Sequence, residues 1–163
     1  VIPVHLEKEV YAEFEADING QNKTIRLQGQ ADRIDKMGNR MRILDYKSGK
    51  SDLMKLKLKD KSPEWMNDVL HQKYKDKARQ LLMYGLMFRG SVDPTASFSA
   101  GIISMINISD WVQYLSLNDV EELSEDLLNA FKESLVDLIA ALYSSDFEFS
   151  HNKDSQYCQH CGN

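Results

Sequence analysis

Cysteine, proline and long apolar runs are all scarce in this chain. Its 163 residues include two cysteines and three prolines, and no apolar run approaches the roughly 18 residues that cross a bilayer. The shortage of cysteine excludes the dense disulfide framework that small secreted domains use. The first residues also lack the basic segment and apolar stretch of a secretion signal. We therefore expect a cytoplasmic protein that does not contact a membrane.

The composition suits one ordinary folded core. Hydrophobic residues make up 42% of the chain and charged residues 28%, which excludes a disordered or fibrous protein. We expect a single domain over residues 1–163. The sequence has no initiator Met, and a Cys-x-x-Cys pair lies two residues from its end. These two features predict that the chain is a fragment of a larger protein.

The charge is unevenly distributed along the chain. The net charge is -5, but residues 36–79 hold 13 of the 20 Lys and Arg against 6 Asp and Glu. One basic segment therefore interrupts an acidic body. By itself such a segment is typical of a solvated loop; the alternative is a surface that binds phosphate groups.

Two hairpins are predicted in the first third of the sequence. Residues 9–18 and 24–35 have the alternating pattern of strands and flank a turn at Asn19-Gly20. A third strand over residues 41–46 follows a second two-residue turn, at Gly38-Asn39.

Helices and one further strand are predicted in the rest of the chain. Residues 67–89 have apolar side chains at helical spacing, and residues 118–143 form a second amphipathic helix that begins at an Asn-Asp cap. Between them, residues 97–108 are typical of a buried strand. The predicted fold class is therefore mixed α/β, a small central sheet flanked by helices.

The second hairpin sets two carboxylates opposite each other. With its turn at Gly38-Asn39, Asp32 pairs with Asp45, and both share a sheet face with Lys47. A sheet avoids facing like charges unless a cation lies between them, and two carboxylates with a backbone carbonyl suit Mg²⁺ or Mn²⁺. Alternatively, Asp32 and Asp45 are scattered surface acids, because a slip of one residue would place them on opposite faces.

On the other face of the same hairpin, Asp35 is expected to face Arg42. We interpret this pair as an ordinary surface ion pair.

Two motifs on these strands resemble those of a known family. Residues 29–35, GQADRID, match the pattern G-x-x-D-R-h-D, and residues 43–49, ILDYKSG, match h-h-D-Y-K-[ST]-G, where h is apolar. They resemble the motifs of RecB/AddB-like nucleases, which are members of the PD-(D/E)XK nuclease superfamily. That family also has a Q-x-x-x-Y motif on the following helix, and Gln80 and Tyr84 match it.

The resemblance implies a restriction-endonuclease-like core and a metal-dependent DNA nuclease, an exonuclease of DNA repair or recombination. By similarity, Asp32, Asp45 and the carbonyl of Tyr46 would bind Mg²⁺ or Mn²⁺, and Lys47 would be catalytic. Its substrate would be single strands or duplex ends of DNA, delivered by a helicase domain or subunit.

A DNA-binding face is predicted on the helix that carries the Q-x-x-x-Y motif. Gln80 and Tyr84 are four residues apart and share one side of the helix, which Lys73 and Lys77 continue. All four are candidates for contact with DNA. The alternative for Gln80 and Tyr84 is a buried amide and a packed aromatic ring that support the core.

The sequence departs from the family in its metal ligands. The family supplies a further His or Glu from an upstream helix, for which this chain has no room. His5, Glu7 and Glu9 are the nearest candidates, and each is expected to be a surface residue at the start of a strand. This departure favours the alternative that the domain no longer cuts DNA and serves as a binding or scaffold module in a repair complex.

The cysteines suggest the remnant of a second metal site. Cys158 and Cys161 resemble the start of the family's C-terminal cysteine group, which binds an iron-sulfur cluster with four cysteines. Two of the four are absent, so a cluster is expected only in the full-length parent. A zinc site with His151 or His160 is an alternative.

Overall fold

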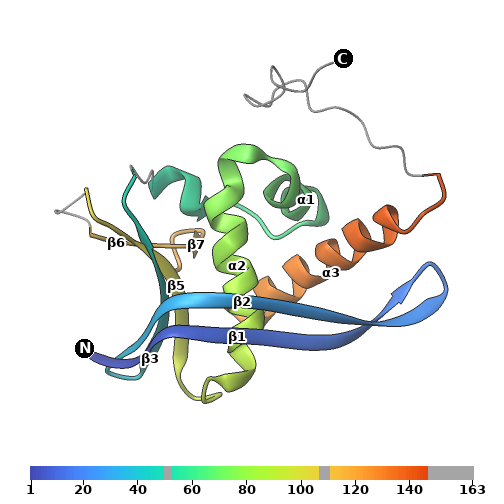
Figure 1. Ribbon diagram of the computed structural model, residues 1–163. Helices are drawn as coiled ribbons and strands as arrows, with labels where there is room; N and C mark the ends of the chain where they lie inside the picture. The colour runs from blue at the N-terminus through green and yellow to red at the C-terminus, as the bar shows by residue number, and fades with distance from the viewer. Residues whose placement is uncertain (50–52, 107–110, 147–163) are drawn as a thin grey trace, which may run out of the picture.

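The chain forms a five-stranded mixed sheet in the order β1-β2-β3-β5-β6 (Figure 1). This computed structural model describes residues 1–49, 53–106 and 111–146. Neighbouring strands are antiparallel except β3 and β5, which run parallel. The mixed α/β class predicted from the sequence is confirmed. The strands are β1 (Ile2–Ile18), β2 (Gln21–Met37), β3 (Arg40–Lys47), β4 (Lys57–Leu58), β5 (Ser97–Ser104), β6 (Val112–Tyr114) and β7 (Ser116–Leu117), of which β4 and β7 form a separate two-stranded sheet.

The first hairpin, β1 and β2, is longer than predicted, with 17 residues in each strand. Its turn is at Asn19-Gly20 as expected, with φ of 55° and 80°. Two successive left-handed residues give the turn the twist that antiparallel strands require.

The second hairpin, β2 and β3, has the predicted register. Gly38, with φ of 61°, begins the turn, and glycine adopts this left-handed conformation without steric cost. The pairs run from Met37–Arg40 to Arg33–Leu44. This register places Asp32 and Asp45 directly beyond the last pair.

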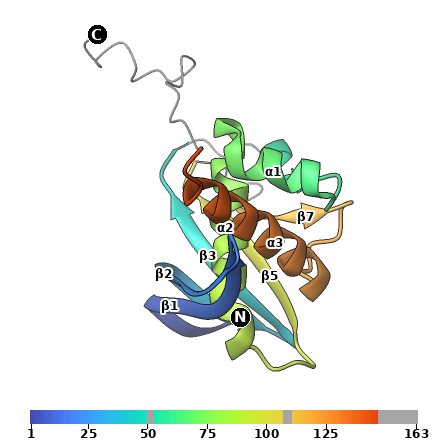
Figure 2. The same cartoon turned by 90° about the vertical axis from the view of Figure 1, so that its right-hand side faces the viewer.

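Two helices, α2 and α3, pack against one face of the sheet, and α1 packs against these two helices (Figure 2). The α-helices are α1 (Pro63–His71), α2 (Asp76–Phe88) and α3 (Glu125–Leu142), and the 3₁₀ turns are η1 (Leu53–Leu56), η2 (Lys73–Lys75) and η3 (Arg89–Ser91). No helix among the described residues is long and apolar enough to span a membrane. The core between sheet and helices is formed by fully buried side chains that include Ile34, Ile43, Leu81, Leu82, Phe98, Ile102 and Phe131.

The single helix predicted over residues 67–89 is wrong. The chain breaks at Gln72, which is extended with φ of -76° and ψ of 127°, so that α1 and α2 are separate helices. Arg79 of α2 donates hydrogen bonds to the carbonyls of Val69 and Leu70, at 3.1 and 2.6 Å. The end of α1 is therefore capped by a side chain from the next helix, which apolar spacing alone does not reveal.

The helix predicted over residues 118–143 begins later than expected. Asn118 and Asp119 are left-handed, with φ of 50° and 63°, and form a tight turn after β7. The cap is Ser124, whose hydroxyl accepts a hydrogen bond from the backbone N–H of Leu127 at 3.2 Å. Asn and Asp tolerate the left-handed conformation, so the same residues that favour a helix cap also favour a turn.

The strand predicted over residues 97–108 is β5, which ends at Ser104. It lies between β3 and β6 and is buried along most of its length, as its composition predicts.

Candidate functional site

The end of strand β3 places Asp45 and Lys47 on the sheet face that packs against α2. Asp45 is buried, with 4% of its surface exposed. Its Oδ1 accepts a hydrogen bond from Nε2 of Gln80 at 3.0 Å. Its Oδ2 lies 2.7 Å from Nζ of Lys47, but no described residue donates an aligned hydrogen bond to it. One oxygen of a buried carboxylate is thus held by charge attraction alone.

The surroundings of Asp45 disfavour its negative charge. Burial raises the pKa of Asp45 above its usual value; the close contact and charge of Lys47 and the hydrogen bond from Gln80 oppose this, and the nearby charge of Asp32 adds to it. The net effect is a raised pKa, because the carboxylate loses more stabilisation on leaving water than Lys47 and Gln80 provide. A further cation at this place would stabilise the ionised form.

Asp32 is fixed beside the peptide group that follows Asp45. Its Oδ2 accepts a hydrogen bond from the backbone N–H of Tyr46 at 2.7 Å. The charge of Asp32 contributes to the raised pKa of Asp45 and to that of Tyr84. The two carboxylates are therefore electrostatic neighbours, as the hairpin register predicts. Their shared binding of one metal ion stays a prediction.

Helix α2 supports Asp45 through the two residues of the Q-x-x-x-Y motif. Nε2 of Gln80 also donates to Oη of Tyr84 at 3.1 Å, and Tyr84 donates to the carbonyl of Gln30 at 2.8 Å. Burial raises the pKa of Tyr84, so its hydroxyl remains a donor. This chain of hydrogen bonds links strand β2, helix α2 and Asp45. The expected DNA contacts of Gln80 and Tyr84 stay predictions, since the described contacts of both side chains are with protein atoms.

The donor set is compatible with a hard divalent cation. Two carboxylates at the end of one hairpin, one of them with a buried oxygen that lacks an aligned donor, suit Mg²⁺, which binds through one or two carboxylates and keeps several waters. Among residues 1–49, 53–106 and 111–146, no group of three or more His, Cys, Asp or Glu side chains could hold a metal. The described residues thus offer two neighbouring carboxylates rather than a closed cage.

The candidates for an additional ligand lie on β1 and are exposed. His5, Glu7 and Glu9 all face solvent, as expected for surface residues. Glu7 lies between the pairs Leu6–Arg33 and Lys8–Ala31, across from Asp32, and is left-handed with φ of 50°. In the strand register, Glu7 is therefore the acidic residue of β1 that lies nearest to Asp32.

The two lysines predicted to continue the Gln80 face belong to different elements. Lys77 lies on α2, three residues before Gln80, and shares its side of the helix. Lys73 lies in η2, beyond the helix break, so the expected continuous helical face is wrong at this residue. Neither lysine is without an interaction partner in the protein.

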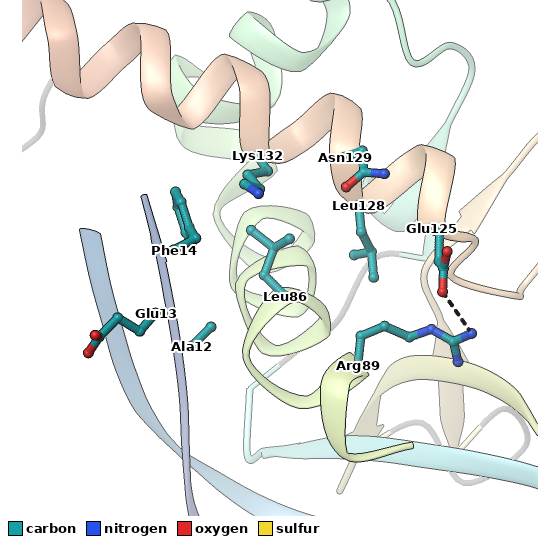
Figure 3. A pocket seen from close by; sticks show the side chains of 9 residues that line it. All are labelled: Ala12, Glu13, Phe14, Leu86, Arg89, Glu125, Leu128, Asn129 and Lys132. Carbon is teal, nitrogen blue, oxygen red and sulfur yellow. Dashed lines mark hydrogen bonds and ion pairs between the residues drawn. The ribbon is translucent and has the colours of Figure 1, made fainter. Parts of the chain in front are cut away.

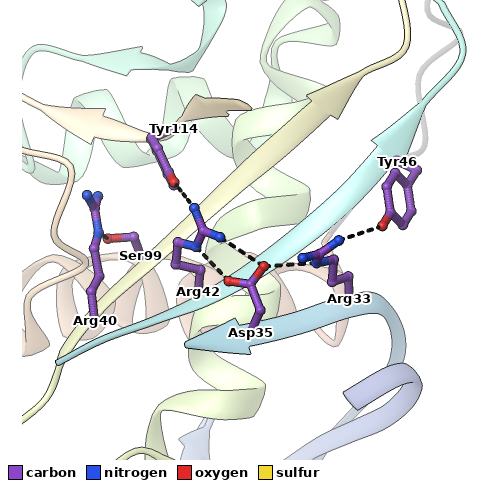
Figure 4. Close-up of polar contacts among 7 residues, drawn as sticks. All are labelled: Arg33, Asp35, Arg40, Arg42, Tyr46, Ser99 and Tyr114. Carbon is purple, nitrogen blue, oxygen red and sulfur yellow. Dashed lines mark hydrogen bonds and ion pairs between the residues drawn. The ribbon is translucent and has the colours of Figure 1, made fainter. Parts of the chain in front are cut away.

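Asp35 and Arg42 form the expected ion pair, but the prediction that this pair lies on the surface is wrong. Both are paired as predicted, but Asp35 is 0% and Arg42 6% exposed. Figure 4 shows Asp35 held between Arg42 and Arg33, through contacts of 2.6 Å from Nε of Arg42 to Oδ1 and 2.8 Å from Nε of Arg33 to Oδ2. Burial opposes the charged form of Arg42, yet its hydrogen bonds to Asp35 and Tyr114 raise its pKa.

Two neighbours of this cluster come from distant parts of the sequence. Tyr114 of β6 accepts a hydrogen bond from Nη1 of Arg42 at 2.7 Å, and Ser99 of β5 accepts one from Nε of Arg40 at 2.7 Å. Arg40 also lies 4.5 Å from the ring centre of Tyr114. No local sequence pattern predicts that Tyr114 and Ser99 lie here. Their presence explains why the Asp35–Arg42 pair is buried, although it lies on the sheet face opposite the helices.

A cavity between β1, α2 and α3 lies away from the carboxylates. It has a volume of about 280 Å³, with Leu86 and Leu128 at its centre and an ion pair between Arg89 and Glu125 at one side (Figure 3). None of the predicted site residues lines it. The predicted cysteine site at Cys158 and Cys161, with His151 and His160, lies outside the described residues.

Comparison with known proteins places the chain in a family. No curated protein matches the chain. Among solved structures, the crystal structure of a protein named SSO0001 is similar, with 17% identity and a TM-score of 0.36 over 86% of this chain and 51% of that one. This chain therefore spans about half the length of that protein. The model of the PD-(D/E)XK nuclease superfamily matches residues 2–162. The chain that carries Asp32 and the Asp45-Tyr46-Lys47 triplet belongs to the PD-(D/E)XK nuclease superfamily.

Proposed function

We propose that this chain is a metal-dependent deoxyribonuclease domain that hydrolyses phosphodiester bonds. The observation that carries the proposal is the meeting of Asp32, Asp45 and Lys47 at the end of the β2–β3 hairpin, where Gln80 holds the buried carboxylate. Family membership supports the reaction class. The catalytic residues would be Asp32, Asp45 and Lys47.

The residues that would hold Mg²⁺ or Mn²⁺ are Asp32, Asp45 and the carbonyl of Tyr46. A bound divalent ion would neutralise charge on the phosphate and acidify an attacking water.

The protein groups have separate roles around this position. Lys47, paired with Asp45 at 2.7 Å, can donate to the scissile phosphate or to the attacking water. Gln80 keeps the carboxylate of Asp45 in place through Oδ1, and Tyr84 anchors Gln80 to strand β2. Charged groups held before the substrate arrives lose little energy to reorganisation during the reaction.

The finer assignment rests on the motifs. The GQADRID and ILDYKSG segments support a RecB/AddB-like exonuclease of DNA repair, which acts in the cytoplasm on DNA ends or single strands beside a helicase domain or subunit. Fold alone would not identify the substrate. An iron-sulfur cluster would belong to the full-length parent.

A second candidate function is a nuclease-like scaffold that binds DNA without cutting it. The observation in its favour is that the described residues hold no group of three metal-ligating side chains. Retention of Asp32, Asp45 and Lys47 together at one place argues for the enzyme.

Cleavage of labelled DNA by the full-length protein tests the proposal. We expect cleavage with Mg²⁺ or Mn²⁺ and none with EDTA. Asp45→Asn and Lys47→Ala should each lower kcat by at least about a hundredfold, because each removes a group that acts on the reacting phosphate or its metal.

The matched control is Asp137→Asn, which changes an exposed carboxylate on α3. It should leave kcat unchanged. Metal-dependent cleavage that survives Asp45→Asn would contradict the catalytic assignment, and absence of cleavage by the unaltered full-length protein would favour the scaffold.

A further inference from the structure

An apolar pocket opens on the sheet face opposite the catalytic carboxylates. It has a volume of about 390 Å³, within the range of small-ligand sites. Its lining residues are Tyr46, Ile103, Ser104, Met105 and Trp111. Tyr46 is 36% exposed, Trp111 60% and Met105 63%. Two aromatic rings and a thioether thus remain in contact with water around one hollow.

The pocket lies at the same end of β3 as the proposed catalytic site. Tyr46 is between Asp45 and Lys47 in the strand, and alternating side chains point to opposite faces. The backbone of Trp111 is held beside the end of β5, because the backbone N–H of Ser104 donates to its carbonyl at 2.9 Å. A strand of nucleic acid with a phosphate at Lys47 would therefore have a neighbouring nucleotide within reach of the pocket around the sheet's end.

An arginine lies beside Tyr46, which lines the pocket. Nη1 of Arg33 lies 3.4 Å from Oη of Tyr46, and the same guanidinium is oriented by Asp35 (Figure 4). The guanidinium of Arg33 keeps its charge at any physiological pH, as every arginine does. Aromatic faces beside an arginine are the combination that binds unpaired bases, since every base presents a π-face and lies next to a phosphate.

We propose that this pocket, called here the base pocket, binds an unpaired nucleobase of the DNA strand whose phosphate lies at Asp45 and Lys47. The proposal deepens the proposed function and rests on it. A base in a duplex is stacked and paired, so it enters only after unpairing. The base pocket therefore favours single strands and frayed ends over intact duplex.

Tryptophan fluorescence tests the base pocket directly. The chain has two tryptophans, so in a Trp65→Phe variant Trp111 is the sole reporter. We expect a single-stranded oligothymidylate to quench this emission to saturation, because a stacked base quenches the indole. A blunt duplex of equal length should quench it much less. Asp45→Asn in the same chain, with EDTA present, prevents cleavage during the titration.

Oligonucleotide affinity gives a second measurement that does not need the Trp65 substitution. Trp111→Ala should weaken binding of the oligothymidylate by about tenfold, within the range of one lost stacking contact. Trp111→Phe should retain most of the affinity. The matched control is Tyr11→Ala, which removes a ring that is 74% exposed on β1, and it should leave affinity unchanged.

The outcomes separate the base pocket from the cleavage reaction. Equal affinity of Trp111→Ala and the unaltered protein, or equal quenching by duplex and single strand, would overturn the base pocket. Neither result would alter Mg²⁺-dependent cleavage by Asp45 and Lys47. Conversely, a protein that never cuts DNA but shows the expected quenching would retain the pocket and lose the nuclease assignment.

Discussion

At the residue scale, the buried carboxylate of Asp45 does not stabilise the fold at neutral pH, so a structural role does not explain its presence. Its raised pKa means that the folded chain binds a proton more tightly than the unfolded chain does. The stability that Asp45 contributes is therefore complete below the ordinary Asp value of about 4 and is lost as the pH rises through the raised value. A buried group that destabilises the fold at neutral pH is typical of a functional site.

This linkage predicts a stabilising substitution. In EDTA at pH 7, Asp45→Asn should raise the Tm, since asparagine avoids the buried charge; for a chain of this size each kcal/mol corresponds to about 2–4 °C. The difference from the unaltered protein should shrink as the pH falls to about 4. Thermal unfolding from pH 4 to 8 measures it, and a lower Tm for Asp45→Asn at pH 7 would contradict the argument.

A substitution of Gln80 can separate two roles of this side chain, the positioning of Asp45 and the binding of DNA. Its amide donates to both Asp45 and Tyr84, so we expect Gln80→Leu to lower kcat about tenfold or more through a misplaced carboxylate. DNA affinity, measured without divalent metal, should change little. The opposite result, weaker DNA binding with unchanged kcat, would return Gln80 to the DNA-binding role predicted from its motif.

At the element scale, close contact between β2 and α2 holds the site together. A Cβ atom on Gly29 would lie 3.0 Å from Cε of Met87 and 3.7 Å from Cε1 of Tyr84. Gly29→Val should therefore destabilise the fold by about 1–3 kcal/mol through overpacking and loosen the Tyr84–Gln30 hydrogen bond.

Denaturant unfolding measures this effect, with Gly90→Val as the control, because a Cβ on Gly90 meets nothing within 4 Å. Met87→Ala in the Gly29→Val background should restore part of the loss, since it makes room for the added methyl groups. Independent, additive effects of the two substitutions would contradict the proposed contact.

At the element scale, some features of the fold can be predicted from the sequence and others cannot. The β2–β3 register follows from a two-residue turn and the alternation of side chains, both of them local, so Asp32 and Asp45 could be placed in advance. The break at Gln72 depends on Arg79 capping α1, and the burial of Asp35 depends on Arg42, which donates a hydrogen bond to Tyr114. These contacts join residues between nine and 72 positions apart, and no periodicity encodes them.

At the scale of the whole molecule, the basic segment of residues 36–79 opposes an acidic remainder. It contains β3, all of the chain between β3 and α2, and the first turn of α2, so we expect it to line the approach of DNA. Lys73→Glu with Lys77→Glu should weaken DNA binding, and each lost phosphate contact should flatten the salt dependence by about 0.7 to 0.9 in slope.

Affinity for one oligonucleotide over a range of salt concentrations measures this slope. Lys8→Glu, an exposed lysine of β1 outside the basic segment, is the matched control and should leave it unchanged. Thermal unfolding of each variant establishes that lost contacts within the protein are not the cause. An unchanged slope in the double variant would make the segment a solvated surface.

The central claim is that Asp32 and Asp45 hold one divalent metal site, and titration with Mn²⁺ tests it most directly. Calorimetry of the full-length protein should show Mn²⁺ binding that Asp45→Asn removes, because a ligand is lost. Lys47→Ala should retain it, because the lysine is not a ligand. Equal Mn²⁺ affinity of Asp45→Asn and the unaltered protein would contradict the metal site and, with it, the catalytic assignment.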